Sequence, residues 1–257
     1  MRGTLWMALP LVALMAAPAQ AGWRDWLDCK NLKDASVRYC DTVEREWKAT
    51  GRLVVDSSPD GGVAVIGWDR DVVHVKAYVH ARGETDADAE GLARRIELQM
   101  SPQRITATGP SDHGWSVTFV VHVPRRTDLD LRAYNGPVGV ESVTGAMTLE
   151  TRNGPISIDN AGGDVRAMSL NGPLNVNLSG RAWAGKGLDA ETRNGPVNLK
   201  IPARYSAVLE SGTRNGPMDI EIPVRIRRGR HFTTELGSGG KPLRVVTYNG
   251  PISIRRI

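Results

Sequence analysis

The chain has 257 residues, a formal net charge of +5 and 24% charged residues, which is ordinary for a folded protein and argues against disorder. Aromatic residues make up only 5% of the chain, with two Phe in total, so a bulky Phe-rich core is not expected. The two Cys residues exclude both a disulfide-framework miniprotein and a four-Cys zinc site.

The first 21 residues have the features of a secretory signal peptide. Arg2 provides a positive start, residues 5–17 are apolar, and Ala19-Gln20-Ala21 fits a cleavage site. The apolar run is too short to cross a bilayer, and no later stretch approaches the ~18 apolar residues of a membrane helix. We therefore predict an exported mature chain, periplasmic or secreted, with no transmembrane segment after cleavage.

Residues 22–50 are predicted to form an N-terminal cap, and the pattern leaves their secondary structure open. Because thiols usually pair in an oxidising compartment, Cys29 and Cys40 are expected to form a disulfide. Closing this small loop would stabilise the fold by roughly 3 kcal/mol on the loop-entropy model. A redox role for these residues is not favoured because the chain has no Cys-x-x-Cys motif.

Residues 51–130 are expected to form a β-rich region with one short helix. Apolar and polar residues alternate over residues 73–80 and 115–123, which predicts two half-buried strands. Between them, residues 87–100 carry Ala, Leu and Ile at mixed helical spacing and are the predicted helix. Thr85 or Asp86 is the candidate N-cap of this helix.

Residues 131–257 contain a repeat built on the tripeptide Asn-Gly-Pro. It occurs six times, against on the order of 0.04 occurrences expected from average composition. Its Asn-Gly pairs are Asn135-Gly136, Asn153-Gly154, Asn171-Gly172, Asn194-Gly195, Asn215-Gly216 and Asn249-Gly250. Apolar residues stand one and three positions after each Pro, and a small residue stands two before each Asn. Each unit therefore predicts a short strand, a corner and another short strand, and the long last step predicts a degenerate unit within residues 224–236.

The corner is predicted to join two strands of a stack. Asn-Gly alone is a strong hairpin signal, but the Pro that follows has no N–H to donate across a hairpin. A corner tolerates Pro at the start of a strand, and Gly would supply the dihedral angles of the bend. Repeats of this length predict an all-β fold, a β-solenoid or β-helix-like stack of short strands whose Asn side chains form an amide ladder. An antiparallel sandwich is the alternative.

Further segments join the Asn-Gly repeats in a family resemblance. They are Val63-Ala64-Val65-Ile66-Gly67-Trp68-Asp69, Val123-Pro124, Gly187-Leu188-Asp189, Ile201-Pro202-Ala203-Arg204-Tyr205-Ser206-Ala207, Leu236-Gly237-Ser238-Gly239-Gly240 and Tyr248-Asn249-Gly250. With them, residues 40–257 resemble the exported bacterial β-strand-repeat proteins called putative adhesins, a domain-of-unknown-function family. The resemblance implies a β-helical stack and a cell-envelope location, and it implies no catalytic residues. Family members more often lack Pro after Asn-Gly. The Pro present in this chain makes its corners stiffer.

Sequence motifs for catalysis, nucleotide binding and calcium-binding repeats are absent, so we expect no catalytic residue, metal or cofactor. His74 and His80 share a strand face but lie roughly 20 Å apart, too far to bind one metal, and are expected to be surface residues.

Two acidic residues near the corners bear on a possible enzymatic role. Glu150 with Arg152, and Glu191 with Arg193, are expected to be surface ion pairs rather than catalytic carboxylates. A β-helix enzyme that cleaves polysaccharides is the alternative, and it requires clustered carboxylates or a metal.

Two basic features indicate the class of partner. Arg152, Arg193 and Arg214 stand directly before Asn and would form an exposed column, while a dense basic run contains Arg225, Arg227, Arg228, Arg230 and His231. Because an exported chain meets little nucleic acid, the expected partners are envelope glycan, anionic lipid or another envelope protein. The competing interpretation is a solvated face that protects a sheet edge from aggregation. We predict a non-enzymatic, adhesin-like interaction or structural module of the envelope.

Overall fold

The structure is a computed structural model that describes residues 37–111, 114–224 and 230–257. The predicted signal peptide and Cys29 lie outside the described residues, so cleavage and the Cys29–Cys40 disulfide stay predictions. Arg225, Arg227 and Arg228 also lie outside them.

The described residues form an all-β structure with two mixed, ten-stranded sheets and one helix, as predicted for the fold class. The first sheet has the order β1 (Val37–Lys48), β4 (Val72–Arg82), β7 (Trp115–Pro124), β3 (Val63–Trp68), β9 (Val138–Glu141), β11 (Ile156–Asp159), β13 (Leu174–Asn177), β15 (Val197–Ile201), β20 (Ile252–Arg256) and β17 (Met218–Ile220). The second sheet has the order β18 (His231–Leu236), β16 (Ala207–Asn215), β19 (Pro242–Asn249), β14 (Gly185–Asn194), β12 (Gly162–Asn171), β10 (Thr144–Asn153), β8 (Asp128–Asn135), β2 (Arg52–Asp56), β6 (Arg104–Thr108) and β5 (Glu97–Met100).

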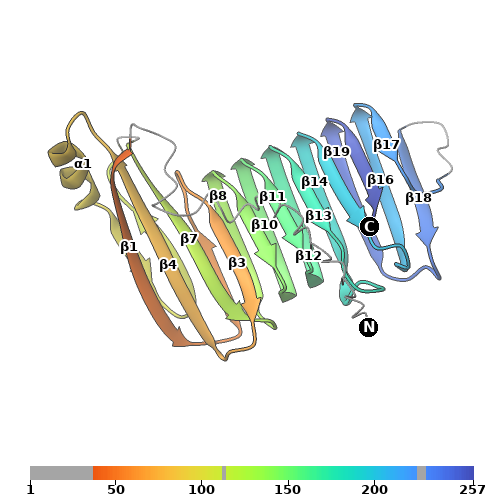
Figure 1. Cartoon of the computed structure of the whole chain (residues 1–257), viewed down its shortest axis with the longest axis horizontal. Helices are drawn as coiled ribbons and strands as arrows, with labels where there is room; N and C mark the ends of the chain where they lie inside the picture. Colours follow the sequence, from red (N-terminus) through yellow and green to blue (C-terminus); the bar gives the residue numbers. More distant parts are fainter. Residues whose placement is uncertain (1–36, 112–113, 225–229) are drawn as a thin grey trace, which may run out of the picture.

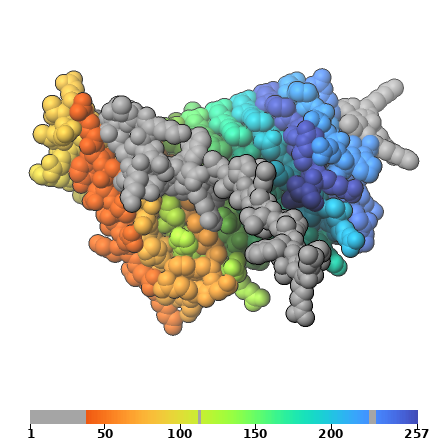
Figure 2. Space-filling view, viewed as in Figure 1, coloured from red at the N-terminus to blue at the C-terminus, as the bar shows by residue number. Residues whose placement is uncertain are grey.

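The strands lie side by side along the long axis of the molecule (Figure 1). The early strands and the helix gather at one end of this axis, and the strands after Ala207 gather at the other (Figures 1 and 2). A site built from the repeats therefore extends along the molecule rather than into a central cleft.

Each Asn-Gly-Pro unit contributes one strand to each sheet. The strand before Asn belongs to the second sheet and the strand after Pro belongs to the first, so β10 and β11 form one unit and β12 and β13 the next. Neighbouring units pair in parallel and in register, with Asn153 opposite Asn171 and Ile156 opposite Leu174. The inward apolar side chains of the two sheets, such as Leu149 and Ile156, are fully buried between them. Stacking like residues on like thus builds one continuous core.

The units do not stack in chain order at the C-terminal end. In the second sheet β19 lies between β14 and β16, and in the first sheet β20 lies between β15 and β17. The sixth unit is therefore inserted between the fourth and the fifth. The predicted degenerate unit within residues 224–236 is wrong, because His231–Leu236 forms β18, which pairs antiparallel with β16.

A further degenerate corner precedes the repeats and was missed in the sequence. Asp60 forms a parallel bridge with Asn135, and Gly61 and Gly62 follow it at the turn from β2 to β3. The apolar residues Val63 and Val65 then pair with Val138 and Val140 of the first Asn-Gly-Pro unit. The sheets therefore continue from residues 51–130 into the repeats without a break in pairing.

The single helix of the described residues is α1 (Asp86–Ala93), shorter than the predicted 87–100. Thr85 is its N-cap: the Asp88 N–H donates to the Thr85 hydroxyl at 3.2 Å, and the Thr85 N–H donates to Asp88 at 3.0 Å. The predicted second half of the helix instead forms β5, which pairs with β6. Pairing with a free sheet edge overrides the weak helical spacing there.

Tyr205, just before β16, is expected to make the stability of the fold depend on pH in the alkaline range. Its side chain is buried, and burial raises its pKa from 10.0 to about 12. A pKa raised in the folded state gives stability that is complete below pH 10 and is lost as the pH rises towards about 12. The parent should therefore lose stability above pH 10, and Tyr205→Phe should not lose this contribution. We expect the free energy of unfolding of Tyr205→Phe, relative to that of the parent, to increase only above pH 10. Urea titrations across this range measure the difference, and a constant difference would contradict the assignment.

Candidate functional site: a column of Arg and Tyr beside an Asn ladder

The six Asn side chains of the repeats form one continuous hydrogen-bonded ladder. Each Nδ2 donates to the Oδ1 of the Asn in the neighbouring unit, at 2.8 to 2.9 Å. In spatial order the ladder contains Asn135, Asn153, Asn171, Asn194, Asn249 and Asn215. At its start, Asn135 Nδ2 donates to the carboxylate of Asp60 at 2.8 Å. The ladder is therefore polarised, with Asn donors directed towards Asp60.

The corner Gly residues are needed for space rather than for unusual dihedral angles, which corrects the sequence-based interpretation. None of the six has a φ in the left-handed region. A Cβ on Gly154 would lie 2.0 Å from the Gly136 carbonyl oxygen, and one on Gly172 would lie 2.1 Å from the Gly154 carbonyl oxygen. The backbones of neighbouring units thus approach each other too closely for any side chain.

The small residue two positions before Asn has a specific role that sequence reasoning missed. In five units it is a buried Thr or Ser whose hydroxyl donates to the corner Gly carbonyl of a neighbouring unit, at 2.8 to 3.0 Å. These residues are Thr151, Ser169, Thr192, Thr213 and Thr247. Because the Pro at each corner has no N–H, the hydroxyl supplies a donor that the backbone there lacks.

The residue directly before each Asn forms a second line along the outside of the second sheet, which we name the outer column. In spatial order it contains Tyr134, Arg152, Leu170, Arg193, Tyr248 and Arg214. Insertion of the sixth unit places Tyr248 between Arg193 and Arg214. Arg therefore alternates strictly with Tyr or Leu, which stacking in chain order would not have produced.

Aromatic rings hold two of the column's guanidinium groups. Arg152 lies over the Tyr134 ring at 5.0 Å from its centroid, and Arg214 lies over the Tyr248 ring at the same distance. Both Tyr side chains are 40% exposed. Such cation–π contacts at exposed sites contribute about 0.5–1 kcal/mol, and they hold each guanidinium group over the Tyr ring.

The column arginines form no ion pair with any described residue. The expected pairs Glu150–Arg152 and Glu191–Arg193 are wrong: Glu150 lies 3.7 Å from Arg132, and Glu191 lies 2.9 Å from Arg244. Arg132 lies directly opposite Glu150 on the adjacent strand, and Arg244 lies diagonally across from Glu191. Side chains on adjacent strands can thus approach more closely than side chains two residues apart on one strand. Arg244 also pairs with Asp189 at 2.7 Å. The carboxylates of Glu150, Asp189 and Glu191 are thus paired with Arg132 or Arg244, and the column arginines have no such partner.

The column ends in a groove of about 650 Å³ at the junction of β14, β19, β16 and β18. Its charged and aromatic lining includes Glu191, Arg214, Arg230, His231, Arg244 and Tyr248. Arg230 Nη1 donates to the Gly216 carbonyl at 3.0 Å, which fixes it beside the last corner. Of the arginines singled out in the sequence, the structure brings Arg214 and Arg230 together here, with Arg193 one strand away from Tyr248 and Arg152 farther along the column.

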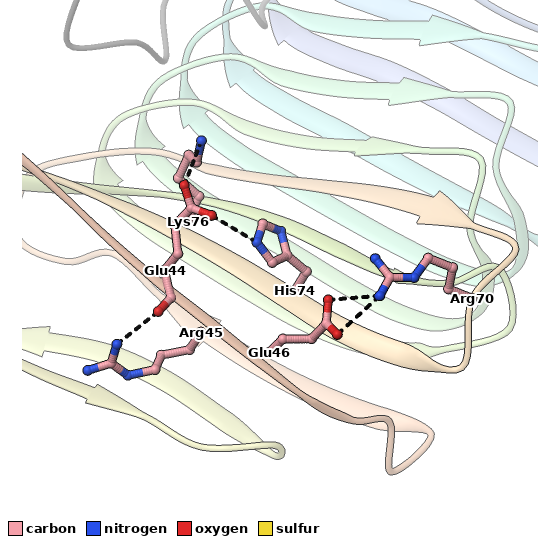
Figure 3. A network of polar contacts seen from close by, with 6 residues as sticks. All are labelled: Glu44, Arg45, Glu46, Arg70, His74 and Lys76. Carbon is pink, nitrogen blue, oxygen red and sulfur yellow. Dashed lines mark hydrogen bonds and ion pairs between the residues drawn. The ribbon is translucent and has the colours of Figure 1, made fainter.

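A second polar cluster lies on β1 and β4 of the first sheet (Figure 3). The Glu44 carboxylate accepts hydrogen bonds from Lys76 at 2.8 Å and His74 at 3.2 Å, and these bonds lower the pKa of Glu44. Glu46 pairs with Arg70 through both carboxylate oxygens, at 3.1 and 3.0 Å. Its charges are matched within the cluster, so it offers less to a charged ligand than the column does.

The His residues do not assemble a metal site in the part of the chain that the structure describes. His80 is half-buried rather than a surface residue, and desolvation lowers its pKa. His74 and His122 have ring centroids 6.0 Å apart, beside Trp68. Among the described residues no group of three or more His, Cys, Asp or Glu is placed to hold a metal ion. Within the same residues no helix has the length and apolar character to cross a membrane.

No family model matches the sequence, and no curated protein matches it. The comparison with solved structures does find similar chains. A putative cell adhesion protein from Clostridium sporogenes is 9% identical with a TM-score of 0.47, covering 85% of this chain and 100% of that one. A putative adhesin from Bacteroides fragilis is 11% identical with a TM-score of 0.30, covering 84% and 97%. A putative lipid binding protein from Parabacteroides distasonis is 9% identical with a TM-score of 0.35, covering 85% and 96%. Two of these three proteins are described as a putative cell adhesion protein or a putative adhesin, the description given to the group that the sequence resembles.

Proposed function

We propose that the chain is an exported, non-enzymatic, adhesin-like interaction module of the cell envelope, and that it binds an anionic ligand along the outer column and its groove. We also propose that residues 131–257 form a β-solenoid, preceded by a β-rich region over 51–130 and a disulfide-bearing cap over 22–50. The alternation of each unit between two sheets, with Asn opposite Asn in parallel register, supports the solenoid.

The observation that carries the binding proposal is the line of column arginines that have no carboxylate partner among the described residues, because Glu150 and Glu191 pair with other arginines. Arg152, Arg193 and Arg214 point outward beside ion pairs that occupy the neighbouring carboxylates. A guanidinium presents a fixed fork of donors that matches carboxylate, sulfate and phosphate groups. Stacking on Tyr134 and Tyr248 holds two of these groups in place, which lowers the entropy lost when a ligand binds.

Charge reversal at two column positions tests the proposal. We expect Arg193→Glu/Arg214→Glu to elute from a carboxylated or sulfated matrix at much lower salt than the parent, because each substitution replaces a ligand contact with a repulsion. Arg181→Glu/Arg204→Glu is the matched control, because it changes the net charge equally. Both control residues are exposed and precede β14 and β16, whereas the column lies at the opposite ends of those strands.

Circular dichroism shows whether both variants keep the fold. Equal loss of retention in the column variant and in the control would mean that the matrix senses net charge alone, and the proposed site would be overturned.

A further inference from the structure

We propose that the ligand of the outer column is a linear acidic glycan that carries one anionic group on every second sugar. The inference rests on the proposed function and deepens it by naming the ligand class. It follows from the spacing of the column, which the order of the strands fixes.

The arginines of the column recur at every second strand. Arg152 lies on β10, Arg193 on β14 and Arg214 on β16, with one strand between each pair of them. Adjacent strands lie ≈ 4.7–4.9 Å apart, so the backbone positions of the column arginines recur about every 10 Å across the sheet. This distance is comparable to a disaccharide repeat of an extended glycan, and the strand spacing is comparable to one sugar.

The positions between the arginines suit uncharged sugars. They hold Tyr134, Leu170 and Tyr248, and the two Tyr rings are 40% exposed. A guanidinium group lies over each Tyr ring, and the exposed remainder of the ring can pack against the C–H face of a pyranose beside it. The hydroxyl groups of the sugar need hydrogen-bond partners. A chain with a charge on every sugar would place alternate anions on β8, β12 and β19, the strands that contribute no arginine to the column.

The Asn ladder supplies the hydrogen-bond partners at the finer spacing. It runs directly beside the column, with one amide on every strand from β8 to β16. Each Nδ2 uses one of its two hydrogens within the ladder, which leaves a second donor on the amide. A glycan lying across the strands would therefore meet an amide at every sugar and a guanidinium at every second sugar.

A comparison of size-matched oligosaccharides at one ionic strength tests this period. The probes are an alternating chain (a hyaluronan octasaccharide), a uniformly charged chain (an octagalacturonate) and a neutral chito-oligosaccharide, with phosphatidylglycerol vesicles as a lipid probe. We expect the alternating chain to bind with a Kd about tenfold or more below that of the uniform chain, a difference that calorimetry resolves. The neutral chain should bind far more weakly than either.

Two variants of Leu170 change the period without touching the arginines. Leu170→Arg places a guanidinium between Arg152 and Arg193, and it should reduce the preference for the alternating chain by strengthening binding of the uniform one. Leu170→Gln is the matched control, because it removes the apolar side chain without adding charge. It should leave the order of the two acidic probes unchanged.

The outcomes separate this inference from the proposed function. Equal affinity of the two acidic glycans, or an unchanged preference in Leu170→Arg, would overturn the alternating period while leaving anionic binding in place. Binding to the vesicles without binding to either acidic glycan would overturn the assignment of a glycan as the ligand. Failure of every anionic probe to bind would overturn the proposed function itself.

Discussion

Replacing Gly172 with Ala is expected to lower the free energy of unfolding by about 3 kcal/mol or more, because the new methyl group has no room. Its Cβ would lie 2.1 Å from the carbonyl oxygen of Gly154 and 2.5 Å from the carbonyl carbon. Both atoms belong to backbone inside a stack, so relief requires neighbouring units to separate rather than one side chain to rotate. The same geometry recurs at every Asn-Gly-Pro corner, and a shift at one corner disturbs the Asn ladder on both sides.

Gly91→Ala provides the matched control. Gly91 lies in α1, and a Cβ there would meet nothing within 4 Å. Because Gly in a helix interior is about 0.8–1.0 kcal/mol less favourable than Ala, this variant should be as stable as the parent or slightly more stable. Urea denaturation of the three proteins measures the effect. A Gly172→Ala variant with the stability of the parent would contradict the close approach of the units.

Replacing Thr192 with Val is expected to destabilise the fold by about 1–3 kcal/mol through a single lost hydroxyl. Thr192 has no exposed surface, and its Oγ1 donates to the Gly172 carbonyl at 2.8 Å. Val has nearly the same shape, so packing is preserved while the buried carbonyl loses this donor. Since the corner Pro offers no N–H, we expect no backbone donor to replace it.

Thr192→Ser separates the hydrogen bond from the packing. Ser already occupies the equivalent position at Ser169, where its hydroxyl donates to Gly154 at 3.0 Å. The Ser variant should lose only the contribution of one methyl group, about 1 kcal/mol, and keep the bond. If Thr192→Val proves as stable as the parent, the hydroxyl has no role in holding the corner.

The repeats were predictable from the sequence because parallel, in-register stacking is the structural form of a sequence period. The spacing within each repeat predicts where its strands lie and that the Asn-Gly-Pro corner separates them. It also predicts that equivalent residues of neighbouring units lie next to each other. The order of the units does not, because Thr247 and Ile252 resemble their counterparts in the other units and fit beside any of them. The separation of Arg193 from Arg214 by Tyr248 was therefore beyond sequence reasoning.

Other parts of the site were missed for separate physical reasons. The ion pairs were assigned along a strand, whereas Glu150 and Glu191 found partners on adjacent strands that no single-strand pattern reveals. The corner at Asp60 lacks both Asn and Pro, and the apolar pair Val63 and Val65 was its remaining signal. The buried hydroxyls were hidden because Thr and Ser were grouped with Ala as small residues, although their burial beside a carbonyl gives them a different role.

The place of β19 and β20 makes the end of the chain an interior part of the sheets. The strands of the fifth unit pair with those of the fourth only through β19 and β20, although Ser206, just before β16, forms a parallel bridge with Ala182. The sheet pairing of the fifth unit with the fourth is therefore complete only once β19 and β20 lie between them. Removal of both β19 and β20 would break the sheet pairing that connects β16, β17 and β18 to the earlier strands, and it would open the groove that these strands line.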